Sequence, residues 1–344
     1  MKTRQGLGPS VHGRRLAMRL VGAALVALLL MPVGAGASAG RANYQATLLL
    51  DWQPNSDHAG IYAALAAGAY ARRGLDLKPV VPSDAGTALG AVARGQAQFA
   101  ISYNTETLLL RARGLPLVSI AAIVQHPLNT IITLRASDIT RPRQLEGKTV
   151  AIYGLASDYA DLNTVVKADG GDPKKLRIVT ASYDLVSSLR TGKADAIIGV
   201  YWSWEGLLLK SRGVKINELR LNQWGVPDYY ELVIVTGKRF AAEHPALVRA
   251  FLAATAEGYR AAMARPAAAA DALIRLNPQY GLAKQRALIV GSVRALGPIM
   301  RDPQGRFGWQ SATRWQAYAN WLVVHKVLTR SVKAGDVMTN AYLP

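Results

Sequence analysis

The sequence predicts an α/β protein of two lobes, each built on a doubly wound sheet, with two crossings of the chain between them and a helical C-terminal tail. Short apolar runs alternate with alanine-rich helical stretches from residue 46 to residue 237. Two polar-to-apolar strands, 129–137 and 229–237, each enter a new unit, and the chain after residue 240 is almost entirely helical. Strands separated by helices of this length are typical of right-handed crossovers and parallel sheets.

The first 39 residues resemble an export signal. Lysine and arginine precede an apolar stretch at 20–33, and Ala37 and Ala39 have the small-x-small spacing of a cleavage site. The stretch is short for a membrane span and contains Pro32, so a cleaved signal peptide at 1–39 is preferred to the alternative of an N-terminal membrane anchor. The chain has no cysteine, which excludes a lipid-anchored lipoprotein, disulfides and thiolate metal sites. We therefore expect an exported, unanchored periplasmic protein.

The alternation can be followed element by element. Strands are expected at 46–50, 75–81, 97–103, 117–124, 129–137, 148–154, 176–182, 194–202, 214–221 and 229–237. Helices are expected at 59–74, 87–96, 106–114, 158–169, 184–192, 205–213, 245–264, 266–276, 281–296 and 311–328.

The two crossing strands suggest how the chain divides. We expect lobe I to comprise 40–133 together with 235–344, and lobe II to comprise 134–234. In this arrangement the helical tail returns to the first lobe, and the crossings act as a hinge between the lobes.

The chain is strongly basic, with a formal net charge of +19. Five of its 41 Lys and Arg lie in the predicted signal peptide, and none of its 22 Asp and Glu does, which leaves +14. The remaining basic residues are scattered among alanines, whereas nucleic-acid-binding proteins cluster them. A solvated basic surface is therefore preferred to a nucleic-acid or membrane-binding function, and no nucleic-acid partner is expected.

No catalytic or metal-binding motif is evident in the sequence. It lacks a phosphate-binding loop with its lysine, a GxGxxG turn, a GxSxG elbow and an HExxH pair, and no two of its five histidines have the spacing of helical metal ligands. We therefore expect no catalytic residues, no metal and no cofactor.

Polar and aromatic residues gather instead after the ends of the predicted strands, where open α/β sheets bind ligands. Several aromatic rings with a few carboxylates and amides suit a flat heterocycle containing nitrogen, because rings stack and carboxylates accept hydrogen bonds from amines. The candidate ligand-binding residues are Trp52, Asn55, His58, Tyr103, Asn104, His126, Tyr153, Ser157, Asp158, Trp202, Glu205 and Tyr230. Trp202 and Trp204 alternate along the chain, so only one of them is expected to face the cleft.

Three segments resemble a known family. They are "DWQPNSDHAGIYAA" (51–64), "ISYNTETLLLRARGLPLVSIAAIVQHPLNTII" (101–132) and "GVPDYYELVIVT" (225–236). Together they are similar to the thiamine-pyrimidine branch of solute-binding proteins of ABC importers. An enzyme, the synthase of the thiamine pyrimidine, shares that fold. The resemblance covers about 43–240 well and the helical tail by architecture alone.

The resemblance implies a type II periplasmic binding protein that closes on formylaminopyrimidine or a related thiamine precursor and delivers it to a permease. It implies that Trp52 stacks on the pyrimidine ring, that Asn55 lines its edge and that Glu205 binds its amine from the opposite lobe. Tyr103, His126 and Tyr230 would wall the cavity.

Structural roles compete with three of these assignments. Trp52 could be a core residue, Glu205 could be a first-turn carboxylate of the helix it begins, and His58 could cap the helix that follows it.

Other functions remain open at this point. The same clamp could bind riboflavin, a flavin precursor or an alkanesulfonate, although a carboxylate in the cleft would repel an anion. The synthase is disfavoured, because that enzyme carries a cysteine-rich motif and consumes a cofactor held by its own lysine and histidine. We expect a monomeric binding protein whose partners are a small heterocyclic ligand and an ABC permease.

Overall fold

The computed structural model describes residues 44–82, 85–181 and 185–344, so the predicted signal peptide lies outside the described residues. Ten strands are described, and every one of them overlaps a strand expected from the sequence. They are β1 (Tyr44–Leu49), β2 (Leu75–Val80), β3 (Phe99–Tyr103), β4 (Leu117–Val124), β5 (Asn129–Leu134), β6 (Thr149–Ile152), β7 (Arg177–Thr180), β8 (Ala196–Tyr201), β9 (Ile216–Arg220) and β10 (Leu232–Gly237).

The helices also follow the expected pattern, apart from two short ones, α7 and α12, that the sequence pattern did not indicate. They are α1 (Ala59–Ala66), α2 (Ala85–Ala93), α3 (Asn104–Ala112), α4 (Ala156–Ala168), α5 (Leu185–Arg190), α6 (Leu207–Ser211), α7 (Lys238–Glu243), α8 (Pro245–Ala264), α9 (Pro266–Leu276), α10 (Arg286–Leu296), α11 (Ala312–Val324) and α12 (Ala334–Val337). Among the described residues, no helix is long and apolar enough to cross a membrane.

The strands form two five-stranded sheets. The first sheet has the order β2-β1-β3-β10-β4, and the second has the order β7-β6-β8-β5-β9. β10 pairs antiparallel with β3 and β4, and β5 pairs antiparallel with β8 and β9. Each of these strands enters from the other sheet, so it runs against its neighbours, and the sheets are mixed rather than fully parallel. The α/β fold with two crossings is confirmed, while the exact lobe boundaries stay a prediction.

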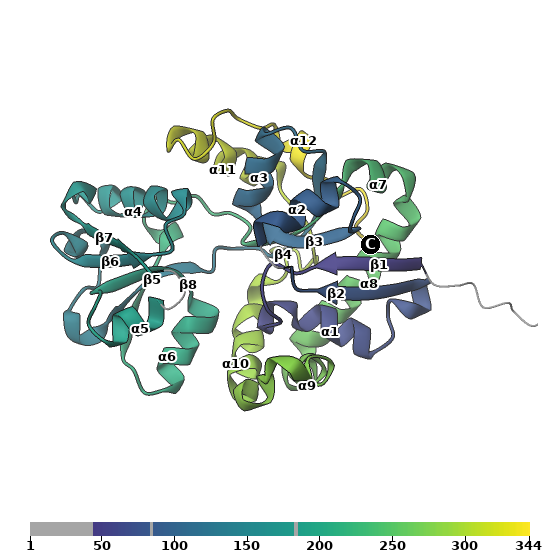
Figure 1. Cartoon of the computed structure of the whole chain (residues 1–344), viewed down its shortest axis with the longest axis horizontal. Coiled ribbons are helices and arrows are strands. Elements are labelled where there is room, and N and C mark those ends of the chain that lie inside the picture. The colour runs from purple at the N-terminus through teal and green to yellow at the C-terminus, as the bar shows by residue number, and fades with distance from the viewer. Residues whose placement is uncertain (1–43, 83–84, 182–184) are drawn as a thin grey trace, which may run out of the picture. The chain divides into compact units, whose positions relative to one another are not determined.

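Helices cover both faces of the first sheet (Figure 1). Alternate residues of β1 belong to different cores, as expected for a strand buried on both faces. Leu49 packs in the cluster that contains Leu89 of α2, whereas Leu48 packs in the cluster that contains Ile61 of α1 and Phe251 of α8. Helix α8 of the helical tail therefore packs against the first sheet.

The contact between α1 and α8 positions the turn that precedes α1. Gly258 of α8 faces Gly60 and Ala64 of α1, and a side chain at Gly258 would lie 2.6 Å from the Ala64 Cβ. The next residue, Tyr259, is fully buried, and its hydroxyl donates to the Asp57 carbonyl at 2.7 Å. Close approach of the two helices thus fixes the backbone at Asp57.

Gly258→Ala is expected to destabilise the protein by about 3 kcal/mol, because the added methyl group overpacks the α1–α8 contact. Thermal unfolding followed by circular dichroism measures the change. Gly291→Ala in α10 is the matched control: a side chain there meets nothing within 4 Å, so the substitution should stabilise the helix by about 0.5–1 kcal/mol. Equal melting temperatures for Gly258→Ala and the wild type would contradict the close packing.

Candidate ligand-binding site

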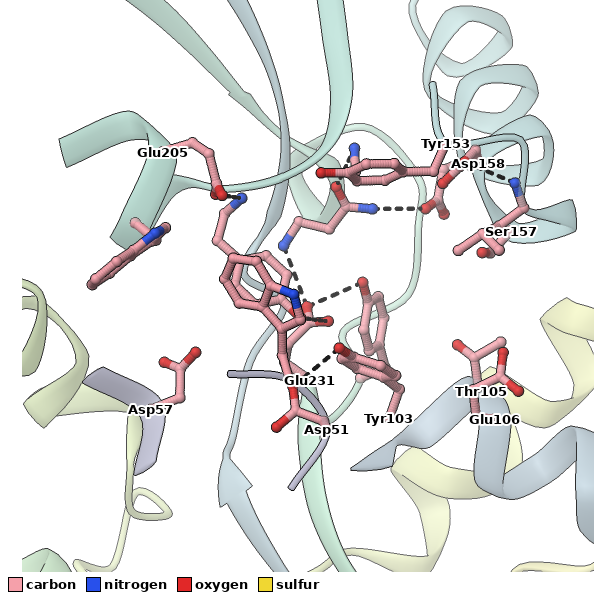
Figure 2. Close-up of a pocket in the computed structure, with 18 of the residues that line it drawn as sticks. Asp51, Asp57, Tyr103, Thr105, Glu106, Tyr153, Ser157, Asp158, Glu205 and Glu231 are labelled. Carbon is pink, nitrogen blue, oxygen red and sulfur yellow. Dashed lines mark hydrogen bonds between the residues drawn. The ribbon is translucent and has the colours of Figure 1, made fainter. Parts of the chain in front are cut away.

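A cavity of about 350 Å³ lies where the carboxyl ends of strands from both sheets meet the crossings of the chain. Its volume falls within the range of small-molecule sites. Figure 2 shows the cavity with its polar side chains pointing inward from several elements. The residues that line it are Asp51, Trp52, Asn55, Asp57, Tyr103, Thr105, Glu106, Asn129, Tyr153, Leu155, Ser157, Asp158, Asp161, Gly199, Tyr201, Trp204, Glu205, Tyr229, Glu231 and Tyr318.

Seven of the twelve candidate residues lie in this lining. They are Trp52, Asn55, Tyr103, Tyr153, Ser157, Asp158 and Glu205. They come from the last residue of β3 and from the segments that follow β1, β6 and β8, so strand-end position brings them together. Whether each one contacts a ligand stays a prediction.

His58 lies behind the cavity rather than in its lining. It is fully buried, and its Nε2 lies 2.8 Å from Asp51 Oδ1. The Asn55 N–H donates to His58 Nδ1 at 3.2 Å, which leaves the ring proton on Nε2 to be donated to Asp51. The histidine therefore holds the turn before α1, and its ring makes no capping hydrogen bond to α1 itself.

In two pairs of aromatic residues, one after β8 and one on the second crossing, the cavity is lined by the residue beside the expected one. Trp204 lines the cavity, whereas Trp202 donates from Nε1 to the Pro127 carbonyl at 3.3 Å. Tyr229 lines the cavity, whereas the Tyr230 hydroxyl turns away and accepts the Ser311 N–H at 2.6 Å. Trp202 and Tyr230 therefore support the crossings from outside the lining.

Asn104 and His126 are also absent from the lining. Asn104, the first residue of α3, is 1% exposed and is directed into the protein. His126 lies on the first crossing, with Nδ1 2.9 Å from Asp228 Oδ1 on the second crossing. Arg314 Nη2 lies 3.3 Å from the other oxygen of Asp228. The His126 side chain thus joins the two crossings.

Acidic residues dominate the polar part of the lining. Within the parts of the chain that the structure describes, seven carboxylates line the cavity and no lysine, arginine or histidine does. They are Asp51, Asp57, Glu106, Asp158, Asp161, Glu205 and Glu231. No group of three His, Asp or Glu among the described residues is arranged to hold a metal ion. The cavity can therefore accept hydrogen bonds from N–H donors and disfavours anions.

Glu231 is the most fully satisfied of these carboxylates. Its Oε2 accepts the N–H groups of Leu128 at 2.7 Å and Asn129 at 3.3 Å, and it also accepts the Tyr229 hydroxyl at 3.4 Å. Its Oε1 accepts the Tyr201 hydroxyl at 3.1 Å. Burial raises the pKa of Glu231, while these hydrogen bonds act in the opposite direction.

Asp158 and Glu205 each combine a structural contact with a place in the lining. Asp158 Oδ2 accepts the N–H groups of Gly154 and Leu155 at 3.0 Å, at the start of α4. Glu205 Oε2 accepts the Tyr201 N–H at 2.8 Å, so it is both a first-turn carboxylate and a lining residue. Burial raises the pKa of both carboxyl groups, and the backbone hydrogen bonds oppose the shift.

Apolar surface is available beside these acids. Trp52 is 53% exposed, which excludes the alternative that it is a core residue. Tyr153 and Leu155 are also exposed large side chains of the lining. The Tyr153 ring lies against Gly199, where a Cβ would approach the ring to 2.8 Å. Flat exposed rings with nearby acceptors can stack on a planar ligand and bind its edge.

Asp57, Asp161 and Tyr318 are lining residues that the sequence reasoning did not select. Asp161 follows Asp158 by three residues on α4, a helical spacing that places both on one face and could have identified it. Asp57 lies within the segment that supplied Trp52, Asn55 and His58. Tyr318 comes from the helical tail, and nothing in its surroundings in the sequence indicates a site.

Comparison with known proteins gives relatives for both the sequence and the fold. The chain is 31% identical over 293 residues to the formylaminopyrimidine-binding protein of Halalkalibacterium halodurans, which covers 85% of this chain and 89% of that protein. It is 27% identical over 246 residues to the 4-amino-5-hydroxymethyl-2-methylpyrimidine phosphate synthase THI5 of Saccharomyces cerevisiae, covering 68% of this chain and 71% of the enzyme.

Solved structures with the same fold are more distant in sequence. The alkanesulfonate-binding protein SsuA from Xanthomonas axonopodis superposes with a TM-score of 0.64 at 16% identity, covering 86% of this chain and 98% of that one. The nitrate-binding protein NrtA from Synechocystis gives 0.65 at 14% identity, with 87% of each chain covered. These likenesses confirm the two-lobed fold of periplasmic binding proteins. The family described as NMT1/THI5 like matches residues 55–269, and the chain belongs to that family.

Proposed function

We propose that this protein is the solute-binding component of an ABC importer and binds an aminopyrimidine precursor of thiamine, similar to formylaminopyrimidine. The observation that carries the proposal is the lining itself: exposed aromatic faces beside seven carboxylates, with no basic side chain among the described lining residues. Exocyclic amines and ring nitrogens of an aminopyrimidine supply the donors that such a lining accepts. The similarity to a formylaminopyrimidine-binding protein supports the same ligand class.

Anionic ligands fit this cavity poorly. The solved structures with the same fold include alkanesulfonate- and nitrate-binding proteins. A sulfonate or nitrate needs cationic side chains or several converging N–H groups. Here Glu205 and six other acidic residues line the cavity, so the Coulomb energy of an anion in it is unfavourable.

An enzymatic role is also disfavoured. The resemblance to the synthase implies that an enzyme of this kind would carry a cysteine-rich motif and would hold a cofactor through a lysine and a histidine. This chain has no cysteine, and the described lining contains neither lysine nor histidine. We therefore propose binding without catalysis.

The proposal includes a location and a partner. Residues 1–39 have the pattern of a cleaved signal peptide without a lipidated cysteine, which supports export to the periplasm. We propose that the protein is an unanchored monomer there. Such a protein delivers its ligand to the permease of an ABC importer. Contacts from both sheets to one ligand would favour the closed arrangement of the clamp.

Binding of aminopyrimidines rather than anions is expected in a calorimetric titration of residues 40–344. We expect 4-amino-5-hydroxymethyl-2-methylpyrimidine and its aminomethyl and formamidomethyl analogues to bind, and methanesulfonate and nitrate to give no heat of binding. Riboflavin is included because its flat ring could also stack. Binding of only a sulfonate, or of only riboflavin, would be consistent with a two-lobed binding protein and would contradict the proposed ligand.

Trp52→Ala is expected to lower aminopyrimidine affinity by about 5- to 150-fold, because base–aromatic stacking contributes about 1–3 kcal/mol. The melting temperature should change by only a few degrees, since the side chain is largely exposed. Trp309→Ala is the matched control, as Trp309 is also exposed and is not a lining residue. Unchanged affinity in Trp52→Ala would show that the ring does not contact the ligand.

A further inference from the structure

Asp57 is an unusual carboxylate for a folded protein. Asp57 is 4% exposed, and its Oδ1 has no hydrogen-bond partner among the described residues. The side chain nevertheless lines the cavity, and Figure 2 shows it pointing into the space that Glu205 faces from the other side. Buried carboxylates are normally paired or hydrogen-bonded, so an unsatisfied one facing a cavity needs a partner from outside the chain.

The neighbouring acids do not share this deficit. Asp51 Oδ1 accepts the His58 ring N–H at 2.8 Å, and Asp51 Oδ2 accepts the Tyr103 hydroxyl at 3.0 Å. Glu231 accepts donors on both of its oxygens. Of these carboxylates, Asp57 is therefore the one with a buried oxygen to which no described residue donates a hydrogen bond.

Among the described residues that line the cavity, no lysine, arginine or histidine compensates the charge of Asp57. Its surroundings hold three further carboxylates, those of Asp51, Glu205 and Glu231. His58 is adjacent, but its Nδ1 accepts the Asn55 N–H, so the ring is a neutral donor to Asp51. The electrostatic potential at Asp57 is thus negative, and it favours a cation.

We propose that Asp57 binds a positively charged amine of the ligand, so that the cavity selects a cationic aminopyrimidine over a neutral one. This inference rests on the proposed function and names the charge of its ligand. The aromatic faces hold the ring, and the charged amine lies between the acids that follow β1 and Glu205.

Asp161 is the second described lining acid with a buried oxygen that has no hydrogen-bond partner, and its role differs. It is 3% exposed, and its Oδ1 has no hydrogen-bond partner among the described residues. Its Oδ2 accepts the Asn129 side-chain amide at 3.3 Å. Because one oxygen is already engaged, Asp161 fits a neutral N–H donor of the ligand, whereas Asp57 fits the charged group.

Two probes that differ in one group test the selection. 4-Amino-5-aminomethyl-2-methylpyrimidine carries a primary amine that is protonated at neutral pH, and its hydroxymethyl analogue is neutral there. A charge-assisted contact predicts that the aminomethyl compound binds about 10- to 100-fold more tightly at pH 7.5. Equal affinities, or tighter binding of the hydroxymethyl compound, would overturn the inference and leave the proposed function standing. Binding of neither compound would overturn both.

The variant Asp57→Asn should bring the affinity for the aminomethyl compound down to that for the hydroxymethyl compound, with both measured on the same variant. Asparagine keeps the shape of the side chain and removes its negative charge. The variant is expected to melt no lower than the wild type, because a buried carboxyl group without a full set of hydrogen bonds is replaced by a neutral amide of the same shape. Asp76→Asn on the exposed side of β2 is the control for the loss of one charge, and its preference should be unchanged. A preference that survives in Asp57→Asn would assign the charged amine to another acid.

A pH dependence should accompany the charge selection. Burial, followed by the charges of Asp51, Glu231 and Glu205, raises the pKa of Asp57 well above its usual value. A cation must compete with the proton held there, so affinity for the aminomethyl compound should rise with pH as the carboxyl group ionises, and binding should release protons.

Calorimetry in two buffers of different ionisation enthalpy measures that release. Glu205 and Glu231 also have pKa values raised by burial, so the release is assigned by comparing the wild type with Asp57→Asn. Smaller release in the variant is the expected result. Equal release in both proteins would contradict a proton on Asp57.

Discussion

The buried carboxylate of Glu231 is the contact on which the rest of the structure depends. It lies where the second crossing becomes β10, and it accepts the backbone N–H groups of Leu128 and Asn129 from the first crossing. Two tyrosine hydroxyls, from Tyr201 and Tyr229, donate to it as well. Removing one partner of such a network leaves buried donors unsatisfied, which costs far more than the bonds contribute on average. A single side chain thus joins both crossings, the end of β8 and one wall of the cavity.

The charge of the cavity is opposite to that of the chain. The formal net charge is +19, yet the described lining carries seven carboxylates and no basic side chain. Net charge is a property of the solvated surface, and it says little about a concave site whose acids are held by local hydrogen bonds. Most of those acids receive donors from the protein, as Asp158 does from the first turn of α4. The acids with an oxygen that receives no donor from the protein indicate which chemical groups the ligand carries.

The sequence predicted the elements well, because the periods of the apolar residues were regular and the strand ends carried the polar clusters. It did not predict the direction of individual side chains. Trp204 rather than Trp202 lines the cavity because the chain after β8 forms a π-helical turn, Trp202–Gly206, instead of continuing as a strand. His58 turned inward because Asp51 and the Asn55 N–H both bind its ring. Tyr318 could not be found at all, since its place depends on how the tail packs.

The two unsatisfied acids lie on opposite parts of the fold. Asp57 precedes α1, which packs on the first sheet, and Asp161 lies on α4, which packs on the second sheet. A ligand with a donor for each would gain its hydrogen bonds only when it contacts both parts at once. Its binding free energy would then favour the arrangement in which both parts approach the ligand, since a ligand shifts a conformational equilibrium by its differential affinity for the two states. The same unsatisfied oxygens that make the cavity costly in isolation would thereby couple ligand recognition to closure of the clamp.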